Sequence, residues 1–408
     1  MYSVKAGKSM AEFEPRRAFE HLDKLAYEIG PRLAGTRGDG MAADYIRKQF
    51  ESYGLKTRVQ EFEFVDRAVR AKVTACILAA AFITFLFLPP EPSLLVWALV
   101  LVVWRSLGWL MPKRKSQNVI GALGERESKK GAAITAHYDS APCMVSYELH
   151  LFVKFTFAPA LVFITLALAL RAFGLLSAWP VAWGILAIVF MPVCVGMFVA
   201  ASSRRVSPGA DDNASGVVVM LEAARVAAES PPADATLTFV ALGAEEQGLV
   251  GARKLVASKA LPKDTMVLNL DMVGAGSQAY VIEGNGVFRR RRTSPELNER
   301  LANCVKSVGL NPKFWWAALA GYDHIPFVRA KMRATTFSIN APDQDKLGNF
   351  IARAFALPNA KTIGYPHIHT LEDTPERIEL TNIERSGAVV LEFIKTILPA
   401  RQNSDGGG

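Results

Sequence analysis

Hydrophobic residues follow two patterns along the chain. Short apolar runs at 132–137, 236–242 and 266–271 are typical of buried strands. Residues 56–65 alternate like a strand with one exposed face, and residues 214–229 place their apolar positions on one side of a helix. Because strands and helices alternate, the pattern predicts an α/β fold with a mixed, mostly parallel central sheet and helices on both faces.

Two longer apolar blocks interrupt this alternation. The first consists of residues 73–88 and 94–111, and the second of residues 151–170 and 172–203. A helix that crosses a bilayer needs about 20 mostly apolar residues, which the second block supplies more fully than the first. We therefore expect about four transmembrane helices, inserted as two hairpins. An interfacial hairpin is the alternative for the first block, and buried core helices are the alternative for both.

These blocks divide the chain into parts. We expect residues 1–70, 112–150 and 204–408 to form one discontinuous polar domain, with the hairpins at 71–111 and 151–203. Half of the residues are hydrophobic and the mean hydropathy is +0.18, which agrees with part of the chain lying in a lipid bilayer.

Charge is distributed unevenly around the hairpins. Their tips carry only Glu91 and Arg171. The flanks next to the polar domain carry basic residues, namely Arg67, Arg70, Lys72, Lys113, Arg114, Lys115, Lys154, Arg204 and Arg205. Basic flanks favour the cytoplasmic side, so the pattern predicts a multi-pass inner-membrane protein whose polar domain is cytoplasmic.

Other features of the composition agree with that location. The N-terminal segment lacks the apolar core of a signal peptide, and the four cysteines include no CxxC pair, which fits a reducing compartment. The net charge is +9, but no long basic tail or RNA-binding aromatic motif is present, so we expect no nucleic-acid partner.

Acidic residues and histidines gather where the predicted strands end. His137 and Asp139 share a face of their strand, so the carboxylate could hydrogen-bond the far ring nitrogen of the histidine, as in many metal sites. Asp211 and Asp212 lie in a glycine-bounded loop before a helix. One such aspartate is readily explained as a helix cap, but two suggest a carboxylate that bridges metal ions.

Further candidates follow the next strands. Glu245 and Glu246 are adjacent, and such carboxylates repel each other unless a cation or a proton separates them; a solvated turn is the plainer alternative. Asp271 closes an apolar strand, and His369 lies in HIHTLEDT, where His367 competes with it. Together these nitrogen and oxygen ligands suit zinc, and two ions with a water between them suit hydrolysis.

The motifs AHYDS, PGADDNASG, GAEEQGLVGA, LNLDMVG and HTLEDT, in this order, resemble those of a known family. It is the family of co-catalytic zinc exopeptidases that includes bacterial leucyl aminopeptidases, aminopeptidase S and glutamate carboxypeptidase II (metallopeptidase clan MH, family 28). IGPRLAGT at 29–36 resembles the family's N-terminal helix and turn. The two apolar hairpins are a departure, and the second separates two of the expected zinc ligands.

The resemblance implies a role for each matching residue. Asp211 would be the carboxylate shared by two zinc ions, with Asp212 following it across a cis peptide bond. The other zinc ligands would be His137, Asp271, Glu246 and His369. Glu245 would be the general base, and Asp139 would orient His137. Asp323 and His324, in GYDHIPF, are candidates for substrate contacts, as is Tyr365.

The implied activity is that of a membrane-bound zinc aminopeptidase acting on peptides. A carboxypeptidase of the same family is an alternative, for which the arginine run 289–292 could bind the terminal carboxylate of a substrate. A glutaminyl-cyclase-type acyltransferase shares the fold but uses one zinc ion. A scaffold without activity would be expected to have lost ligands, but none is missing. A transporter would be expected to carry charges in the middle of its transmembrane helices, and the second pair has none there, so both alternatives are disfavoured.

Overall fold

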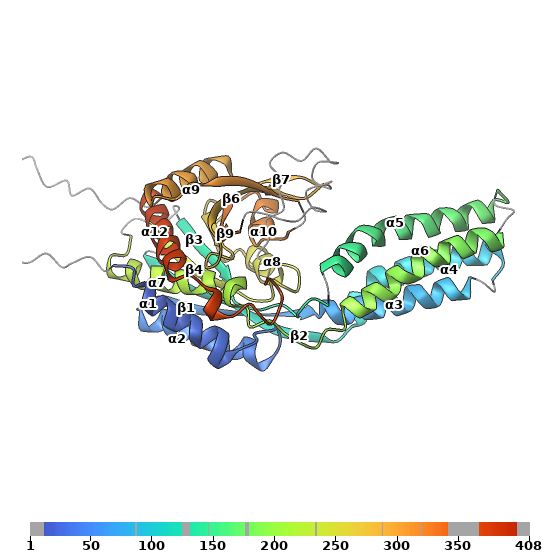
Figure 1. Ribbon diagram of the computed structural model, residues 1–408, viewed down its shortest axis with the longest axis horizontal. Helices are drawn as coiled ribbons and strands as arrows, with labels where there is room; N and C mark the ends of the chain where they lie inside the picture. The colour runs from blue at the N-terminus through green and yellow to red at the C-terminus, as the bar shows by residue number, and fades with distance from the viewer. Residues whose placement is uncertain are drawn as a thin grey trace, which may run out of the picture. The chain divides into compact units, whose positions relative to one another are not determined.

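The computed structural model describes residues 12–85, 88–124, 131–145, 147–175, 179–232, 235–287, 289–318, 320–341 and 367–397. The chain forms two compact units (Figure 1). The sheet unit consists of Met1–Phe62, Lys115–Ala141 and Val206–Gly408. The helical unit consists of Glu63–Arg114 and Pro142–Arg205.

A mixed nine-stranded sheet forms the centre of the sheet unit. In sheet order, its strands are β1 (Lys56–Val65), β2 (Lys113–Gly124), β4 (Thr236–Leu242), β3 (Gly131–His137), β5 (Met266–Leu270), β9 (Arg333–Asn340), β6 (Gln278–Asn285) and β7 (Arg291–Arg292), and β8 (Lys313–Ala317) pairs with β6. The four central strands β4, β3, β5 and β9 are parallel, whereas β2 and β6 flank them in antiparallel orientation. The predicted α/β fold with a mixed, mostly parallel sheet is confirmed.

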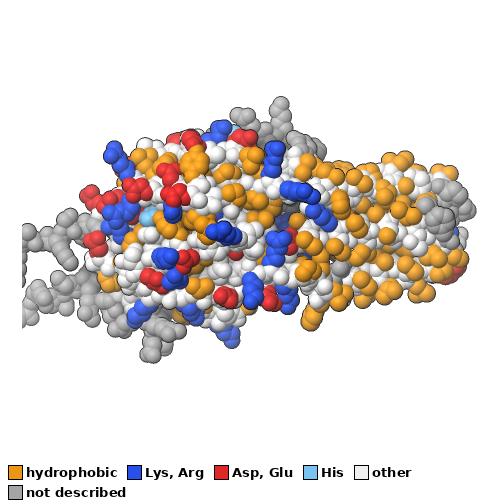
Figure 2. Space-filling model, turned by 90° about the horizontal axis from the view of Figure 1, so that it is seen from below, with side chains coloured by type: hydrophobic (Ala, Val, Ile, Leu, Met, Phe, Trp, Pro, Cys, Tyr) orange, Lys and Arg blue, Asp and Glu red, His pale blue; other side chains and the backbone are white. Residues whose placement is uncertain are grey.

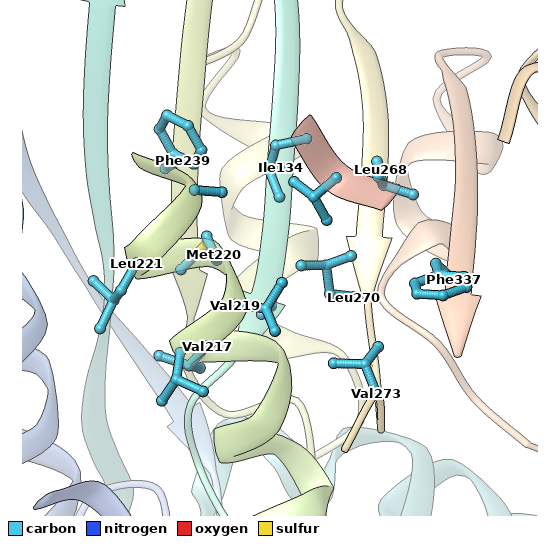
Figure 3. Packing of buried hydrophobic residues seen from close by; sticks show 14 of the residues in the cluster. Ile134, Val217, Val219, Met220, Leu221, Phe239, Leu268, Leu270, Val273 and Phe337 are labelled. Atoms are coloured by element: carbon cyan, nitrogen blue, oxygen red, sulfur yellow. The ribbon is translucent and has the colours of Figure 1, made fainter. Parts of the chain in front are cut away.

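One face of the sheet packs against α7 (Gly216–Glu229). Val217, Val219 and Leu221 of this helix are fully buried, and the helix lies against the side chains of the central strands (Figure 3). The same cluster includes residues of the remaining helices on this face, which are α1 (Pro15–Asp23), the π-helix Lys24–Ile29, α2 (Arg37–Ser52), α9 (Pro295–Ser307) and α12 (Leu380–Ile397).

The opposite face is covered by α8 (Val250–Ala257) and α10 (His324–Arg329). Alternating strand residues serve the two faces: Phe239 packs with α7, whereas Val240 packs with α8 and α10. Since both faces are covered, the central strands are mostly apolar, and the charged side chains gather where the strands end.

The helical unit contains α3 (Arg67–Thr84), α4 (Pro90–Leu110), α5 (Tyr147–Ala172) and α6 (Trp179–Ala200). Aromatic rings hold its core together: Phe82 stacks on Trp183 with ring centroids 4.1 Å apart, and Phe190 lies 5.2 Å from Phe82. The outside of the unit is also apolar, since Leu95 is 72% exposed and Ile188 is 76% exposed. Figure 2 shows hydrophobic side chains over the visible surface of these helices.

Within the described residues, two helical segments are long and apolar enough to cross a membrane, Phe155–Ala172 in α5 and Trp183–Ala200 in α6. The expectation of four transmembrane helices is therefore wrong in number. The first pair is less suitable because α3 begins with three basic residues, Arg67, Arg70 and Lys72, and α4 contains Glu91 and Arg105.

Candidate metal centre

The candidate residues meet at the carboxyl edge of the central parallel strands. His137 is the last residue of β3, Glu245 and Glu246 follow β4, and Asp271 follows β5. The backbone is bent sharply at this edge, because Ala244 and Met272 adopt left-handed conformations with φ of 54° although neither is glycine. Such conformations are costly and cluster at functional sites.

Two groups of ligand atoms converge at this edge, and Asp212 belongs to both. The first group contains His137, Asp212 and Asp271, and the second contains Asp212, Glu246 and His369. One carboxylate oxygen of Asp212 lies 3.2 Å from Nε2 of His137, and the other lies 3.0 Å from Nε2 of His369. The ligand atoms of each group lie within 4.8 Å of one another.

The expected bridging role of Asp211 is wrong in this structure, because that side chain points elsewhere. Its Oδ1 accepts hydrogen bonds from the backbone N–H groups of Gly274, at 2.9 Å, and Ala275, at 3.1 Å. Asp211 therefore joins the loop before α7 to the segment after β5, while its neighbour Asp212 lies between the histidines. The cis peptide bond is likewise one position later than expected, between Asp212 and Asn213.

Asp139 also makes contacts other than those expected. Nδ1 of His137 lies 3.2 Å from the backbone carbonyl oxygen of Asp139 and 3.8 Å from its carboxylate. The carboxylate instead accepts hydrogen bonds from the backbone N–H groups of Glu245, at 2.9 Å, and Glu246, at 3.1 Å. Asp139 therefore holds the turn that carries the two glutamates as well as the histidine ring.

Asp373, for which the sequence predicted no role, holds the loop of Asp212 in a similar way. Its two carboxylate oxygens accept the backbone N–H groups of Asp211, at 2.7 Å, and Asp212, at 3.1 Å. Asn213 fixes the following turn, because its side chain donates to the carbonyl of Leu270 and accepts from the N–H of Met272. The sequence signal for Asp373 was its place in HTLEDT.

The electrostatics of the centre are dominated by the histidines and Asp212. Burial alone would lower the pKa of His137, but the hydrogen bond with Asp212 and the charges of Glu245 and Asp271 raise it well above its usual value. Loss of hydration also opposes a charge on His369, but Glu246 and Asp212 raise the pKa of His369 well above its usual value. In return, and despite its burial, the pKa of Asp212 lies below its ordinary range because both histidines hydrogen-bond to it.

Glu245 and Asp271 favour their neutral forms when no cation is present. Loss of hydration and the charge of Glu246 raise the pKa of Glu245 well above its usual value, although His137 opposes this. Burial and the charges of Asp212 and Asp323 do the same to Asp271. A bound cation would stabilise the charged forms of the carboxylates that gather around the two histidines.

GYDHIPF contributes further buried groups around the centre. Asp323 is fully buried, neither of its carboxylate oxygens has a hydrogen-bond partner within the described part of the protein, and burial raises its pKa to about 7. His324 hydrogen-bonds to Thr336, at 2.7 Å, and Tyr322 stacks on its ring. Because Asp323 affects the pKa values of both Glu245 and Asp271, its carboxylate lies close to the centre.

The remaining expectations concern the segment near His369. His369, rather than His367, reaches Asp212 and Glu246, and a left-handed backbone with φ of 55° aims it there. Tyr365 lies outside the described residues.

The two groups suit zinc. Imidazole nitrogens and carboxylate oxygens are ligands that zinc accepts, and three protein ligands leave a position for water or substrate. His137, Asp212 and Asp271 would hold one ion, and Asp212, Glu246 and His369 a second.

Comparisons with known proteins agree with this arrangement. Residues 196–394 match the sequence profile of Peptidase family M28. The chain is 32% identical over 204 residues to aminopeptidase YwaD of Bacillus subtilis, a match that covers 46% of this chain but 38% of that protein. The chain therefore spans less than half of that relative's length.

Solved structures share the fold. A zinc aminopeptidase from Bacillus subtilis superposes with a TM-score of 0.58 and 20% identity, covering 95% of this chain and 96% of the other. A glutaminyl cyclase from Bacteroides thetaiotaomicron gives a TM-score of 0.59 and 17% identity, covering 95% and 99%. At these identities the likeness concerns the fold alone.

Proposed function

We propose that this chain belongs to the co-catalytic zinc exopeptidases of peptidase family M28 and is a membrane-bound aminopeptidase that uses two zinc ions. The observation that carries the proposal is the position of Asp212, whose two oxygens face the two histidines of separate donor groups. A carboxylate placed between two such groups supports a pair of ions rather than one.

Zinc held by these ligands would acidify water and polarise the scissile carbonyl. Glu245, next to the ligand Glu246, is the group that takes a proton from the attacking water and returns it to the leaving amine. Asp139 keeps Glu245 in place through the backbone N–H that it accepts.

The surroundings favour an aminopeptidase over a carboxypeptidase. Asp323 offers a buried carboxylate whose oxygens have no hydrogen-bond partner among the described residues, which suits the ammonium group of a free peptide N-terminus. A carboxypeptidase needs a cation for the terminal carboxylate. The arginine run 289–292 is a poor source, because Arg289 and Arg291 lie near Arg329, at the opposite end of α10 from Asp323.

We also propose that α5 and α6 lie in the lipid bilayer of the inner membrane, with the sheet unit in the cytoplasm. Exposed apolar side chains on these two helices, such as Phe163 (63% exposed) and Ile188 (76% exposed), support insertion, since a water-facing surface of this kind would promote aggregation. The basic residues at the start of α3 and after α6 support the cytoplasmic placement.

A substrate panel tests the proposed activity. The zinc-loaded, detergent-solubilised full chain would be given peptides with free N-termini, the same peptides with acetylated N-termini, and peptides that begin with glutamine. We expect release of N-terminal residues from free peptides only, and no activity after chelation. Shortening of acetylated peptides from the C-terminus would indicate a carboxypeptidase. Ammonia release from N-terminal glutamine without peptide cleavage would indicate a glutaminyl cyclase, and either result would overturn the proposal.

A further inference from the structure

Arg32 is a fully buried arginine next to the loops that carry the metal ligands. None of its hydrogen bonds to described residues reaches the side chain of a candidate ligand. Its guanidinium group donates to backbone carbonyls. These belong to Tyr138, at 2.8 Å, Leu25, at 3.0 Å, Gly30, at 3.2 Å, Pro208, at 2.7 Å, and Gly209, at 2.7 Å.

Three of these carbonyls lie on the two loops that carry metal ligands. Tyr138 follows His137, and Pro208 and Gly209 come shortly before Asp212. The backbone of Arg32 adds to the connection with the first loop, because its N–H donates to the hydroxyl of Ser140 at 3.0 Å. One side chain therefore joins the strand end of β3 to the loop before α7, although these segments lie far apart in the sequence.

The loop before α7 is fitted closely over the guanidinium group. Gly209 has a φ of +63°, and a Cβ atom there would lie 2.9 Å from Nη2 of Arg32 and 2.7 Å from the carbonyl oxygen of Asp212. The position therefore requires glycine for two reasons, its backbone conformation and the lack of space.

Asp373 holds the same loop through its N–H groups. Arg32 binds the carbonyls of residues 208 and 209, and Asp373 accepts the N–H groups of residues 211 and 212. Arg32 also keeps its positive charge. Burial lowers the pKa of Arg32 only to about 10, because nearby Asp373, Asp139 and Asp212 favour the charged form. A permanent cation and an anion thus hold the segment that leads to the shared carboxylate.

We propose that Arg32 and Asp373 form a clamp on residues 208–212 that sets the zinc affinity of the centre, with neither residue touching metal or substrate. Arg32 is a positioning residue whose planar group can reach carbonyls on both ligand loops at once. A lysine would keep the charge but could not match this fork of donors. The inference rests on the metal centre of the proposed function and not on its peptide specificity.

The test compares zinc affinity in Arg32→Lys, Asp373→Asn and wild-type full chain, measured by chelator competition. Arg37→Lys, at the exposed first residue of α2 directly after the motif that contains Arg32, is the matched control. We expect about 10–100-fold weaker zinc binding in Arg32→Lys and in Asp373→Asn, as for other residues that orient metal ligands. The control should stay within about twofold of wild type, which is small on that scale.

Two further readouts separate clamping from general stabilisation. The absorption spectrum of the cobalt-substituted protein should change in Arg32→Lys, while the circular dichroism of the metal-free protein stays that of wild type. Zinc affinity and cobalt spectra that match wild type in either clamp variant would overturn the proposal. If Arg32→Lys does not fold, Asp373→Asn decides the question alone. Zinc binding by the wild type without peptide cleavage would count against the proposed function only.

Discussion

Replacing each of the two adjacent aspartates by asparagine distinguishes their roles. Asp212 makes two charge-assisted contacts, at 3.2 Å with His137 and at 3.0 Å with His369. Zinc ions held by the two groups would replace these contacts with one contact each to the same carboxylate. Taking each at the ~1.5–3 kcal/mol of a charge-assisted contact, their loss in Asp212→Asn amounts to about 3–6 kcal/mol. At 1.4 kcal/mol per tenfold, zinc affinity should fall by about 10²–10⁴-fold.

Asp211→Asn should be much milder. Burial, together with the charge of Asp373, raises the pKa of Asp211 well above its usual value, so its carboxyl is close to neutral and an amide resembles it. The amide oxygen of asparagine can still accept from Gly274 and Ala275. We therefore expect zinc affinity within about tenfold of wild type, below the usual effect of losing a partner of a metal ligand.

The assay is chelator competition on the metal-free variants, with zinc content after dialysis as a second measurement. Each variant serves as the control for the other, because both replace a carboxyl group by an amide in the same loop. A larger loss in Asp211→Asn than in Asp212→Asn would refute the reasoning, since it would make Asp211 the shared ligand.

Three further predictions concern other buried groups. Asp139→Asn should lower kcat/KM by about 10–100-fold, because the N–H group of either Glu245 or Glu246 loses its acceptor. Asp44→Asn on the exposed side of α2 is the control. Equal activity of the two variants would contradict the role of Asp139. Asp323→Asn should raise KM for free-amine peptides by about 10–100-fold, the equivalent of one charged hydrogen bond, whereas an unchanged KM would remove Asp323 from substrate binding. Burial lowers the pKa of His21 from 6.5 to about 4. The folded state therefore favours neutral His21, and the stability that this preference contributes is complete above pH 6.5 and is lost as the pH falls from 6.5 through about 4. Between pH 7 and pH 4 the metal-free wild type should lose about 3 kcal/mol more unfolding free energy than His21→Gln, measured with urea; parallel losses in both proteins would show that His21 is not the cause.

The sheet could be predicted from the sequence because its central strands are covered on both faces. Covered strands are mostly apolar and carry no charge, so the runs that form β3, β4 and β5 stand out against the polar segments. Polar residues at the ends of such runs are conspicuous for the same reason. The pattern of apolar runs therefore suffices to place His137 and Asp271 at one edge of the sheet.

Assignments that depend on side-chain direction could not be predicted in this way. Asp211 and Asp212 are adjacent and chemically identical, and only the path of the loop decides which one faces the histidines. Asp139 shows the same limit, since its strand spacing allowed contact with His137 but the backbone N–H groups after β4 lie closer to its carboxylate.

Arg32 had no predicted role for another reason. Its function depends on backbone carbonyls, and a sequence does not reveal which carbonyls remain without a partner when the loops come together. The number of membrane helices was overestimated because Arg67, Arg70 and Lys72 were interpreted as flanks of the first apolar run, whereas they lie within α3.

The account depends most directly on Glu245 acting as the base beside a metal centre that it does not itself hold together. The decisive measurement is kcat of Glu245→Gln together with its zinc content, on one preparation of the full chain. We predict zinc content equal to wild type and a fall in kcat of about 10²–10⁴-fold, the usual contribution of a general acid–base group. Peptidase activity near that of wild type, with zinc retained, would contradict the account.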